Sequence, residues 1–242
     1  MRPEQDAFGR EIYDYFHTGE AVEIIERDDG FIAVSGGPPI YFSSYVDWPP
    51  HVQEALTYVQ GRVLDVGCGA GRFALYLQAQ GHEVLGIDNS PLALEVCRQR
   101  GVKETRLLSV TQVSARQLGQ FGSIIMMGNN FGLFGNPRRA KWLLRRFYGM
   151  TGVDGRIIAE SNAPQSSAKP YHQAYHERNR QRGRPPGQLR LRVRYLNYTG
   201  PWFDYLIVSP AEMQEILAGT GWKATRFIES EGSVYTAIIE KE

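Results

Sequence analysis

The sequence predicts an α/β fold built on a doubly wound, mostly parallel sheet. Short apolar runs typical of buried strands alternate along the chain with segments of helical pattern. Glycines and a Ser-Pro pair stand where helices usually end and begin. Strands that alternate with helices form parallel sheets covered on both faces. A chain of 242 residues is long enough to bury such a core in one domain.

The elements of this sheet follow from the pattern in chain order. Ser90 and Pro91 are expected to open one helix as N-cap and N1 residues, and Gly81 and Gly101 to end two helices. We expect strands at 63–66, 83–88, 107–110, 123–127 and 156–160, and helices at 72–80, 91–100 and 138–150.

A glycine-rich turn follows the first expected strand. It reads VLDVGCGAGRF over residues 63–73, with glycine at positions 67, 69 and 71. Glycine adopts positive φ without strain and lets a ligand approach the backbone. A dinucleotide-binding turn would have its third glycine where Arg72 stands, and the lysine of a phosphate-binding loop is missing. The spacing therefore argues against a pyrophosphate ligand.

Two acidic residues accompany these glycines. Asp65 precedes the turn and Asp88 ends the second expected strand. Ligands of open α/β sheets bind at the carboxyl ends of the strands, where both acids are expected. Asp88 is placed to accept hydrogen bonds from two ribose hydroxyls, and Asp65 favours a ligand with an ammonium group. Adenosine joined to a cationic amino acid describes S-adenosylmethionine better than NAD.

At these residues the sequence resembles a known family. VLDVGCGAGRF and VLGIDNSP are similar to motifs I and II of the class I S-adenosylmethionine-dependent methyltransferases. The resemblance covers about residues 61–160 and the C-terminal hairpin. It implies a Rossmann-like methyltransferase fold with a seven-stranded sheet, an antiparallel last strand and S-adenosylmethionine as cofactor. GWKATRFIES and SVYTAIIEKE match the two closing strands.

The resemblance also implies roles for single residues. The glycine turn would lie against the methionine part of the cofactor, Asp88 would hold the ribose, and Asn89 would lie near the adenine. Asn129 would line the pocket after the fourth strand, with Asn130 beside it as a substrate-binding candidate. The family often has an acid after the third strand, and Ser114 is our prediction for that position. The predicted cofactor-binding set is Asp65, Gly67, Gly69, Gly71, Asp88, Asn89, Ser114 and Asn129.

The segments outside the shared core are expected to shape the acceptor site. Tyr41 and Tyr45 are candidates for acceptor contacts from a lid, although packing of these rings on the core is an equal alternative. We expect a single methyltransferase domain over 1–242, with an N-terminal lid or substrate segment at 1–60, a cofactor-binding core at 61–160, a substrate-side insertion at 161–207, and a closing helix and hairpin at 208–242.

The insertion is rich in arginine. QLRLRVRY alternates strictly, which predicts a strand with its arginines on one face. WFDYLIV predicts the partner strand, and this hairpin is expected to roof the active site or to extend the sheet. Arg192 and Arg194 are candidates for an anionic acceptor, because guanidinium groups bind carboxylate and phosphate bidentately. A solvated strand face with ion pairs is the alternative.

His172 and His176 are the candidates for a catalytic residue. Their i, i+4 spacing puts them on one face of a helix. Either histidine has the chemistry of a general base, and ordinary partly exposed histidines are the alternative. A metal site would need a third ligand that the spacing does not supply, so no metal is expected.

Composition restricts the partners. A net charge of +1 gives no overall field for nucleic acid. No apolar run approaches the ~18 residues of a membrane span, and Cys68 and Cys97 form no CxxC motif, which favours a reducing cytoplasm. We expect a cytoplasmic methyltransferase acting on a small molecule. The alternatives are an RNA or protein methyltransferase docking through the arginine-rich insertion, and a non-catalytic cofactor-binding regulator. The acceptor, the catalytic base and the oligomeric state stay open.

Overall fold

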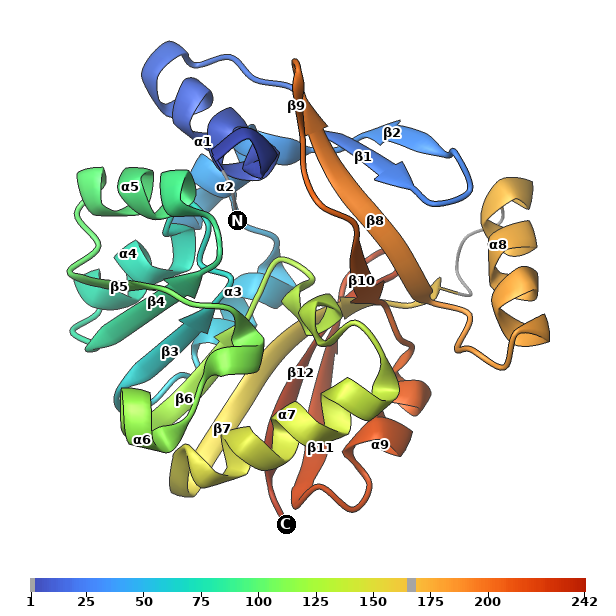
Figure 1. Cartoon of the computed structure of the whole chain (residues 1–242). Coiled ribbons are helices and arrows are strands. Elements are labelled where there is room, and N and C mark those ends of the chain that lie inside the picture. Colours follow the sequence, from blue (N-terminus) through green and yellow to red (C-terminus); the bar gives the residue numbers. More distant parts are fainter. Residues whose placement is uncertain (1–2, 165–168) are drawn as a thin grey trace. The chain divides into compact units, whose positions relative to one another are not determined.

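The computed structural model describes residues 3–164 and 169–242 (Figure 1). The helices are α1 Ala7–Thr18, α2 Gly37–Phe42, α3 Pro50–Leu56, α4 Arg72–Ala79, α5 Pro91–Gln99, α6 Ala115–Leu118, α7 Pro137–Gly149, α8 Pro170–Gln181 and α9 Pro210–Leu217. The strands are β1 Ile24–Arg27, β2 Ile32–Val34, β3 Val63–Val66, β4 Val84–Asp88, β5 Glu104–Leu107, β6 Phe121–Met126, β7 Thr151–Asn162, β8 Gln188–Tyr195, β9 Tyr198–Thr199, β10 Phe203–Leu206, β11 Trp222–Glu229 and β12 Val234–Lys241. The expected insertion at 161–207 includes residues 165–168, which lie outside the described residues.

The strands of the described residues form two sheets. One has seven strands in the order β11-β12-β7-β6-β3-β4-β5. The pairs β3–β4, β4–β5 and β6–β7 are parallel, whereas β12 runs antiparallel to β7 and to β11. This sheet confirms the predicted α/β class and the antiparallel closing strand. The other sheet has the order β10-β8-β1-β2, with β9 paired to β8.

Contacts between residues divide the chain into two compact units, which are interleaved in sequence. The first consists of Met1–Trp48, Gly61–Val113 and Arg190–Phe203, and the second of Pro49–Gln60, Ser114–Leu189 and Asp204–Glu242. The single domain expected from the sequence stays a prediction.

In the first unit, β3 and β4 carry the two acids predicted from the sequence. Every residue of both strands is buried, as expected for strands covered on both faces. Asp65 lies opposite Gly86 in the parallel pair β3–β4, and Asp88 is the last residue of β4. Ser90 caps α5 by accepting a hydrogen bond from the backbone N–H of Ala93 at 3.0 Å. The chain thus turns from strand to helix directly beside Asp88.

The third expected strand is wrong in position. β5 covers Glu104–Leu107 instead of 107–110, and Val110–Gln112 forms a 3-10 helix, η3. Leu107 is 59% exposed, so the apolar run that suggested the strand does not enter the core. β5 is an edge strand, and its position is fixed by pairing with β4 rather than by hydrophobic burial.

Helix α1 packs against α5 in the first unit (Figure 1). Ile12 is fully buried in a cluster with residues of α5. Asp6 caps α1, since its Oδ1 accepts a hydrogen bond from Gly9 N at 3.0 Å. Its Oδ2 accepts from Ser90 Oγ at 2.9 Å and from Leu92 N at 3.2 Å. One buried carboxylate therefore caps α1 and fastens it to the start of α5.

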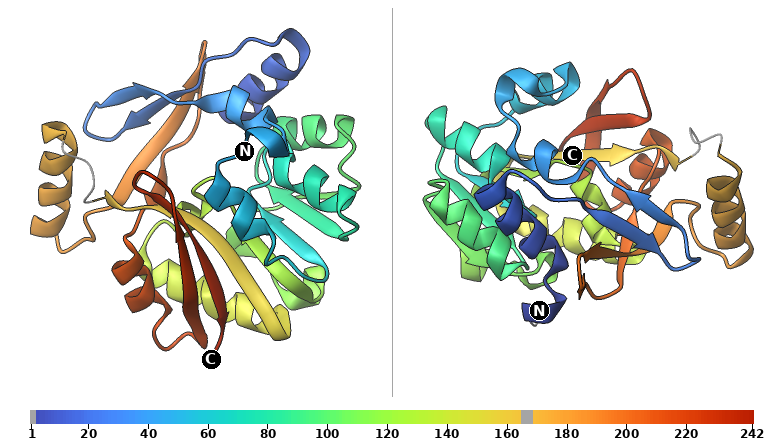
Figure 2. Two further views of the ribbon diagram at one scale, coloured as in Figure 1. Left: turned by 180° about the vertical axis from the view of Figure 1, so that it is seen from behind. Right: turned by 90° about the horizontal axis from the view of Figure 1, so that it is seen from above.

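The N-terminal segment and the insertion share the second sheet. β1 is antiparallel to β2 and also to β8, with Glu26 opposite Arg192. Figure 2 shows the β1–β2 hairpin alongside β8. The expectation that the inserted hairpin would extend the main sheet is therefore wrong, because the edge of β8 is hydrogen-bonded to β1. β9 is a further short strand, which the alternation of the sequence did not predict.

The second unit contains β6, β7, β11 and β12 with α7 and α9. β7 is longer than the expected 156–160, because β12 pairs with it from Arg156 to Asn162. α7 buries Ala140, Leu143, Leu144 and Phe147, which recur at helical spacing along one face. Within residues 3–164 and 169–242, no helix combines the length and the apolar character that crossing a membrane requires.

Candidate cofactor-binding site

The turn after β3 requires glycine at the three predicted positions. Gly67, Gly69 and Gly71 have φ values of 74°, 51° and 79°, all in the left-handed region. A Cβ at Gly71 would lie 2.6 Å from Val102 Cγ2 and 2.8 Å from Cys97 Sγ, so glycine there also serves close packing. A Cβ at Gly69 would meet nothing closer than Phe8 Cζ at 3.6 Å. Gly69 therefore faces α1, whereas Gly71 faces the core.

The backbone amides of this turn are used by the protein itself. Gly67 N and Cys68 N donate to Ile87 O at 2.9 and 3.1 Å. Gly69 N donates to Asp88 Oδ2 at 3.0 Å. Phosphate-binding turns instead present successive amides to the anion. The geometry thus suits a ligand without pyrophosphate, as the glycine spacing predicted.

Asp65 is a buried acid whose carboxylate is only partly satisfied. Its side chain is 1% exposed, and Oδ2 has no hydrogen-bond partner in the described structure. Burial raises the pKa of Asp65 to about 7, and the charge of Asp88 adds to this rise. Arg72 and a hydrogen bond to the backbone of Ala74 act in the opposite direction. An unsatisfied buried carboxyl of this kind favours a cationic ligand.

Asp88 is held in place by the backbone on both sides. Oδ2 accepts from Gly69 N at 3.0 Å and Oδ1 accepts from Ser90 N at 2.9 Å. Burial raises the pKa of Asp88, while these hydrogen bonds lower it. The backbone of Asn89 adds a third hydrogen bond that lowers the pKa, and because a carboxylate has about four acceptor sites, capacity for a ribose hydroxyl remains. Asn89 follows directly and is exposed.

These residues fit S-adenosylmethionine. The orphaned oxygen of Asp65 suits an ammonium group, the free acceptor capacity of Asp88 suits a ribose, and the turn offers close approach at Gly69. A sequence model of the methyltransferase domain matches residues 63–155. A S-adenosylmethionine-dependent methyltransferase from Bacteroides fragilis, solved in complex with S-adenosyl-L-homocysteine, matches 100% of this chain and 97% of its own, with a TM-score of 0.83 and 26% identity.

Residues 63–155 of the chain match a methyltransferase domain, and the whole-chain match is to an S-adenosylmethionine-dependent enzyme of this kind, which supports the class I S-adenosylmethionine-dependent methyltransferase family that the motifs indicated. S-adenosylmethionine is the cofactor of this family, which confirms the cofactor predicted from the motifs. The ubiquinone biosynthesis O-methyltransferase of Bordetella avium is 34% identical over 82 residues, which is 31% of this chain and 34% of that protein. The 2-heptyl-1-hydroxyquinolin-4(1H)-one methyltransferase of Mycobacteroides abscessus is 37% identical over 73 residues, or 28% and 32%. The chain thus spans about a third of the length of these curated relatives.

The two tyrosines predicted for the lid of this methyltransferase lie in different surroundings. The hydroxyl of Tyr41 donates to Glu23 Oε1 at 2.9 Å, and its ring lies edge-on to Phe8 at 5.6 Å. Tyr45 is stacked on Tyr76 of α4 with ring centroids 4.4 Å apart, and it contacts Trp48 edge-on at 5.5 Å. Tyr41 therefore contacts Phe8, the residue of α1 that lies nearest to Gly69. Tyr45 instead packs on Tyr76 of α4.

Asn129 has the signs of a functional position in the second unit. It is a non-glycine residue with φ of 62°. Its N–H donates to Glu160 Oε1 at 2.9 Å, and its carbonyl accepts from the Tyr205 hydroxyl at 2.6 Å. Its side-chain Oδ1 is buried without a hydrogen-bond partner in the described residues. A non-glycine residue in the left-handed region whose backbone is hydrogen-bonded by two side chains, and whose own side-chain oxygen accepts no hydrogen bond, is typical of a ligand-binding position.

Asn130 and Ser114 show fewer features of a binding site than Asn129. Asn130 begins η4, a 3-10 helix over Asn130–Phe134, and is half-buried. Ser114 precedes α6 as its N-cap, although its side chain makes no capping hydrogen bond. Because β5 ends at Leu107, Ser114 lies further along the chain from the strand end than the sequence suggested. Its contact with adenine stays a prediction.

His172 and His176 lie one turn apart on α8, as their spacing predicted. His176 is 6% exposed and His172 is half-buried. Among the residues that the structure describes, no group of three or more His, Cys, Asp or Glu side chains is arranged to hold a metal ion. The general-base role of either histidine stays a prediction.

The arginines of β8 are bound to an acid of the same sheet. Arg192 Nε and Nη2 donate to the two carboxylate oxygens of Glu26 at 2.8 and 2.9 Å, and Arg194 Nη1 donates at 3.1 Å. The Arg192 guanidinium also lies over the ring of Trp202 at 4.5 Å. The hydrogen bond from Arg192 lowers the pKa of Glu26. These contacts favour the interpretation of a strand face stabilised by ion pairs, rather than that of an anion-binding surface.

Two buried acids near the turn escaped the sequence analysis. Glu11 of α1 and Glu23, just before β1, are 0% and 4% exposed. The available signal was a charged residue on the buried face of α1, between Ala7 and Ile12, which are both fully buried. Nothing in the sequence indicated that Glu23 would lie beside it.

Proposed function

We propose that this protein transfers the methyl group of S-adenosylmethionine to a small-molecule acceptor. The observation that carries the proposal is the turn after β3, which combines internally bonded amides with two acids that retain acceptor capacity. Both curated relatives named above are methyltransferases of small molecules by their names. The match to the Bacteroides fragilis methyltransferase over the whole chain supports the same activity.

The cofactor supplies a methyl carbon that is already electrophilic, because it is bound to a positively charged sulfur. The protein then has to bind, orient and exclude water, since in-line displacement depends mainly on positioning. Asp88 accepts hydrogen bonds from the ribose hydroxyls, and Asp65 faces the ammonium group. Asn129 offers its orphaned Oδ1 to the methionine part or the acceptor. Asn89 and Ser114 are proposed for the adenine side.

An oxygen or nitrogen acceptor has to lose a proton, which a side chain with a pKa near neutrality takes up well. His172 and His176 are the proposed candidates for this base. The proposed compartment is the cytoplasm, supported by the free, buried thiols of Cys68 and Cys97, which persist in a reducing environment.

Binding and turnover test this proposal separately. Calorimetry should detect S-adenosylmethionine and S-adenosylhomocysteine and no binding of NAD, and the reverse result would refute the cofactor assignment. Incubation with a labelled methyl donor and a metabolite extract, followed by mass spectrometry, should reveal a labelled small molecule. Label found only in RNA or protein would favour a macromolecular acceptor. Cofactor binding without any labelled product would favour a non-catalytic regulator.

A further inference from the structure

Glu11 is a buried acid whose interacting side-chain neighbour is another acid, Glu23. α1 turns it inward together with Ala7 and Ile12, and its side chain is 0% exposed. Both carboxyl oxygens are buried, and neither accepts a hydrogen bond in the described residues. Burial raises the pKa of Glu11 to about 11, and the nearby acids Glu23 and Asp6 add to the rise. No basic group contributes in the opposite direction.

Glu23 supplies a second carboxyl group at the same place. Its Oε1 accepts from the Tyr41 hydroxyl at 2.9 Å, and its Oε2 accepts from the Ser35 hydroxyl. Ser35 in turn accepts a hydrogen bond from Gly37 N at 3.0 Å. Glu23 is thus fixed by neutral hydroxyl donors, and after burial its charge contributes most to the raised pKa of Glu11. The two acids form a buried pair without a counter-charge in the described residues.

One member of the pair, Glu11, lies on the helix that covers the glycine turn, and Glu23 lies just before β1. Phe8 and Ile12 of α1 are the nearest neighbours of Gly69, at 3.6 and 3.9 Å from the position of a Cβ on it. Glu11 lies between these two residues in the helix. The ring of Phe8 contacts that of Tyr41 edge-on at 5.6 Å. Phe8 therefore links the glycine turn to Tyr41, whose hydroxyl donates to Glu23.

We propose that Glu11 and Glu23, with the rings of Phe8 and Tyr41, bind a cationic amino group of the methyl acceptor. An alkylammonium group would supply the counter-charge that the pair lacks and would replace the proton held by Glu11, which goes to solvent. Charge-assisted hydrogen bonds to carboxylates and contact with aromatic faces are the interactions that recognise alkylammonium ions. The ammonium group of the cofactor is accounted for by Asp65. The inference rests on the proposed function, because it concerns the acceptor of that reaction.

A matched pair of probes tests the charge requirement. Phenethylamine and 2-phenylethanol differ in the amino group alone, and both are titrated into the whole protein with and without saturating S-adenosylhomocysteine. The amine should bind about tenfold more tightly than the alcohol. Glu11→Gln should abolish this preference, and Glu20→Gln should retain it, because Glu20 is an exposed residue at the end of the same segment. Glu23→Gln gives a second variant of the pair.

The titration of Glu11 provides an independent measurement. In protein labelled with ¹³C at the glutamate carboxyl carbons, the Glu11 signal is assigned with Glu11→Gln, and its pKa should fall by about one unit or more when the amine is bound. Equal binding of amine and alcohol, or an unchanged Glu11 titration, overturns the inference. Loss of S-adenosylhomocysteine binding in Glu11→Gln by about tenfold also overturns it, since the pair would then serve the cofactor. Failure of the wild type to bind S-adenosylhomocysteine would instead refute the proposed function. The titrations of amine and alcohol in the absence of S-adenosylhomocysteine would then still decide the inference.

Discussion

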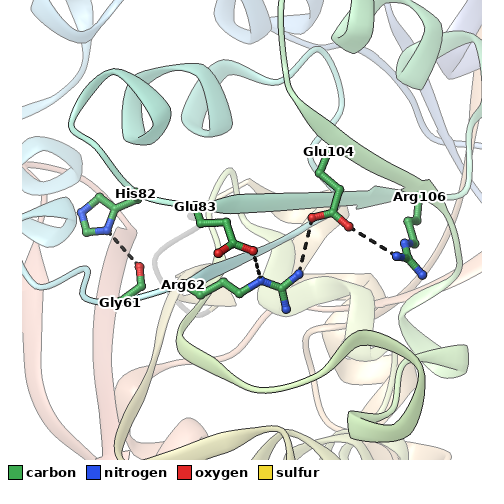
Figure 3. Close-up of polar contacts among 6 residues, drawn as sticks. All are labelled: Gly61, Arg62, His82, Glu83, Glu104 and Arg106. Carbon is green, nitrogen blue, oxygen red and sulfur yellow. Dashed lines mark hydrogen bonds and ion pairs between the residues drawn. The ribbon is translucent and has the colours of Figure 1, made fainter.

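The charged side chains at the two ends of the strands β3, β4 and β5 differ in whether they have partners of opposite charge. At their amino ends, Arg62 Nε contacts Glu83 Oε1 at 2.5 Å, and Arg62 Nη2 contacts Glu104 Oε2 at 3.4 Å. Arg106 extends this chain of alternating charges, at 3.3 Å from the other oxygen of Glu104 (Figure 3). These side chains are 25–68% exposed, and each charge has an opposite neighbour.

The carboxyl ends of the same strands gather buried charges of one sign. Asp65 and Asp88 are 1% and 7% exposed, and α1 adds the buried Glu11 beside the turn. Burial raises the pKa of all three acids. The amino ends therefore satisfy their charges within the protein. At the carboxyl ends, Asp65 Oδ2 accepts no hydrogen bond in the described residues and neither does the carboxyl of Glu11, which destabilises the free protein.

Glu11→Gln should stabilise the free protein at neutral pH. The unfolded chain loses this proton near the ordinary pKa, while the folded protein keeps it up to about pH 11, so stability falls as pH rises between these values. At pH 7 the substitution should raise the free energy of unfolding by about 3 kcal/mol at most, because glutamine does not titrate. Urea unfolding at pH 7 and pH 4 checks it. The gain should vanish at pH 4, and an equal gain at both values would contradict a raised pKa.

Asp88→Ala should weaken cofactor binding by about 2 kcal/mol, within the range for hydrogen bonds to a charged group. The change also leaves the N–H groups of Gly69 and Ser90 without their acceptor, so some loss of folding stability is expected. Calorimetry with S-adenosylhomocysteine and a parallel urea titration separate the two effects. Unchanged affinity would exclude Asp88 as the ribose ligand.

The cofactor turn was predictable from sequence because its parts are neighbours in the chain. The glycine spacing requires left-handed backbone at three positions, and Asp65 and Asp88 belong to consecutive strands. The acid pair was not predictable, since Glu11 and Glu23 meet only after α1 and β1 have folded onto different neighbours. The ion pair of Glu26 with Arg192 joins residues 166 positions apart, and no local pattern indicates it. Edge strand β5 was misplaced because pairing, rather than burial, sets its position.

Cofactor affinity should fall as pH drops through 7. The pKa of Asp65 is raised to about 7 in the free protein, and only the ionised carboxylate attracts the cationic cofactor. Binding should therefore be tight above this pKa and weaken below it, by about tenfold, or ~1.4 kcal/mol, per pH unit at most. Calorimetry with S-adenosylhomocysteine between pH 5.5 and 8.5 checks the direction. Asp65→Asn should flatten the profile, and a parallel decline in that variant would point to another group.

Arg62→Ala should have the smallest effect. Its ion pairs are partly exposed, and such pairs contribute about 0–1 kcal/mol to folding stability. The loss should shrink further at high salt, since screening acts on exposed charges. S-adenosylhomocysteine affinity should not change, because the residue lies at the opposite strand ends from the turn. A large loss of affinity would show that the two ends of these strands are energetically coupled.

The pairing of β1 with β8 sets the order in which the chain folds as it is synthesised. Asp6 meets its partner Ser90 once 84 further residues have been added, but Glu26 has to wait for Arg192, 166 residues later. At ribosomal rates this wait lasts roughly 10–30 s. During that interval the free edge of β1 is a template for pairing with other chains. The segment that is made first is therefore completed late, and in the meantime one edge of β1 stays open to pairing.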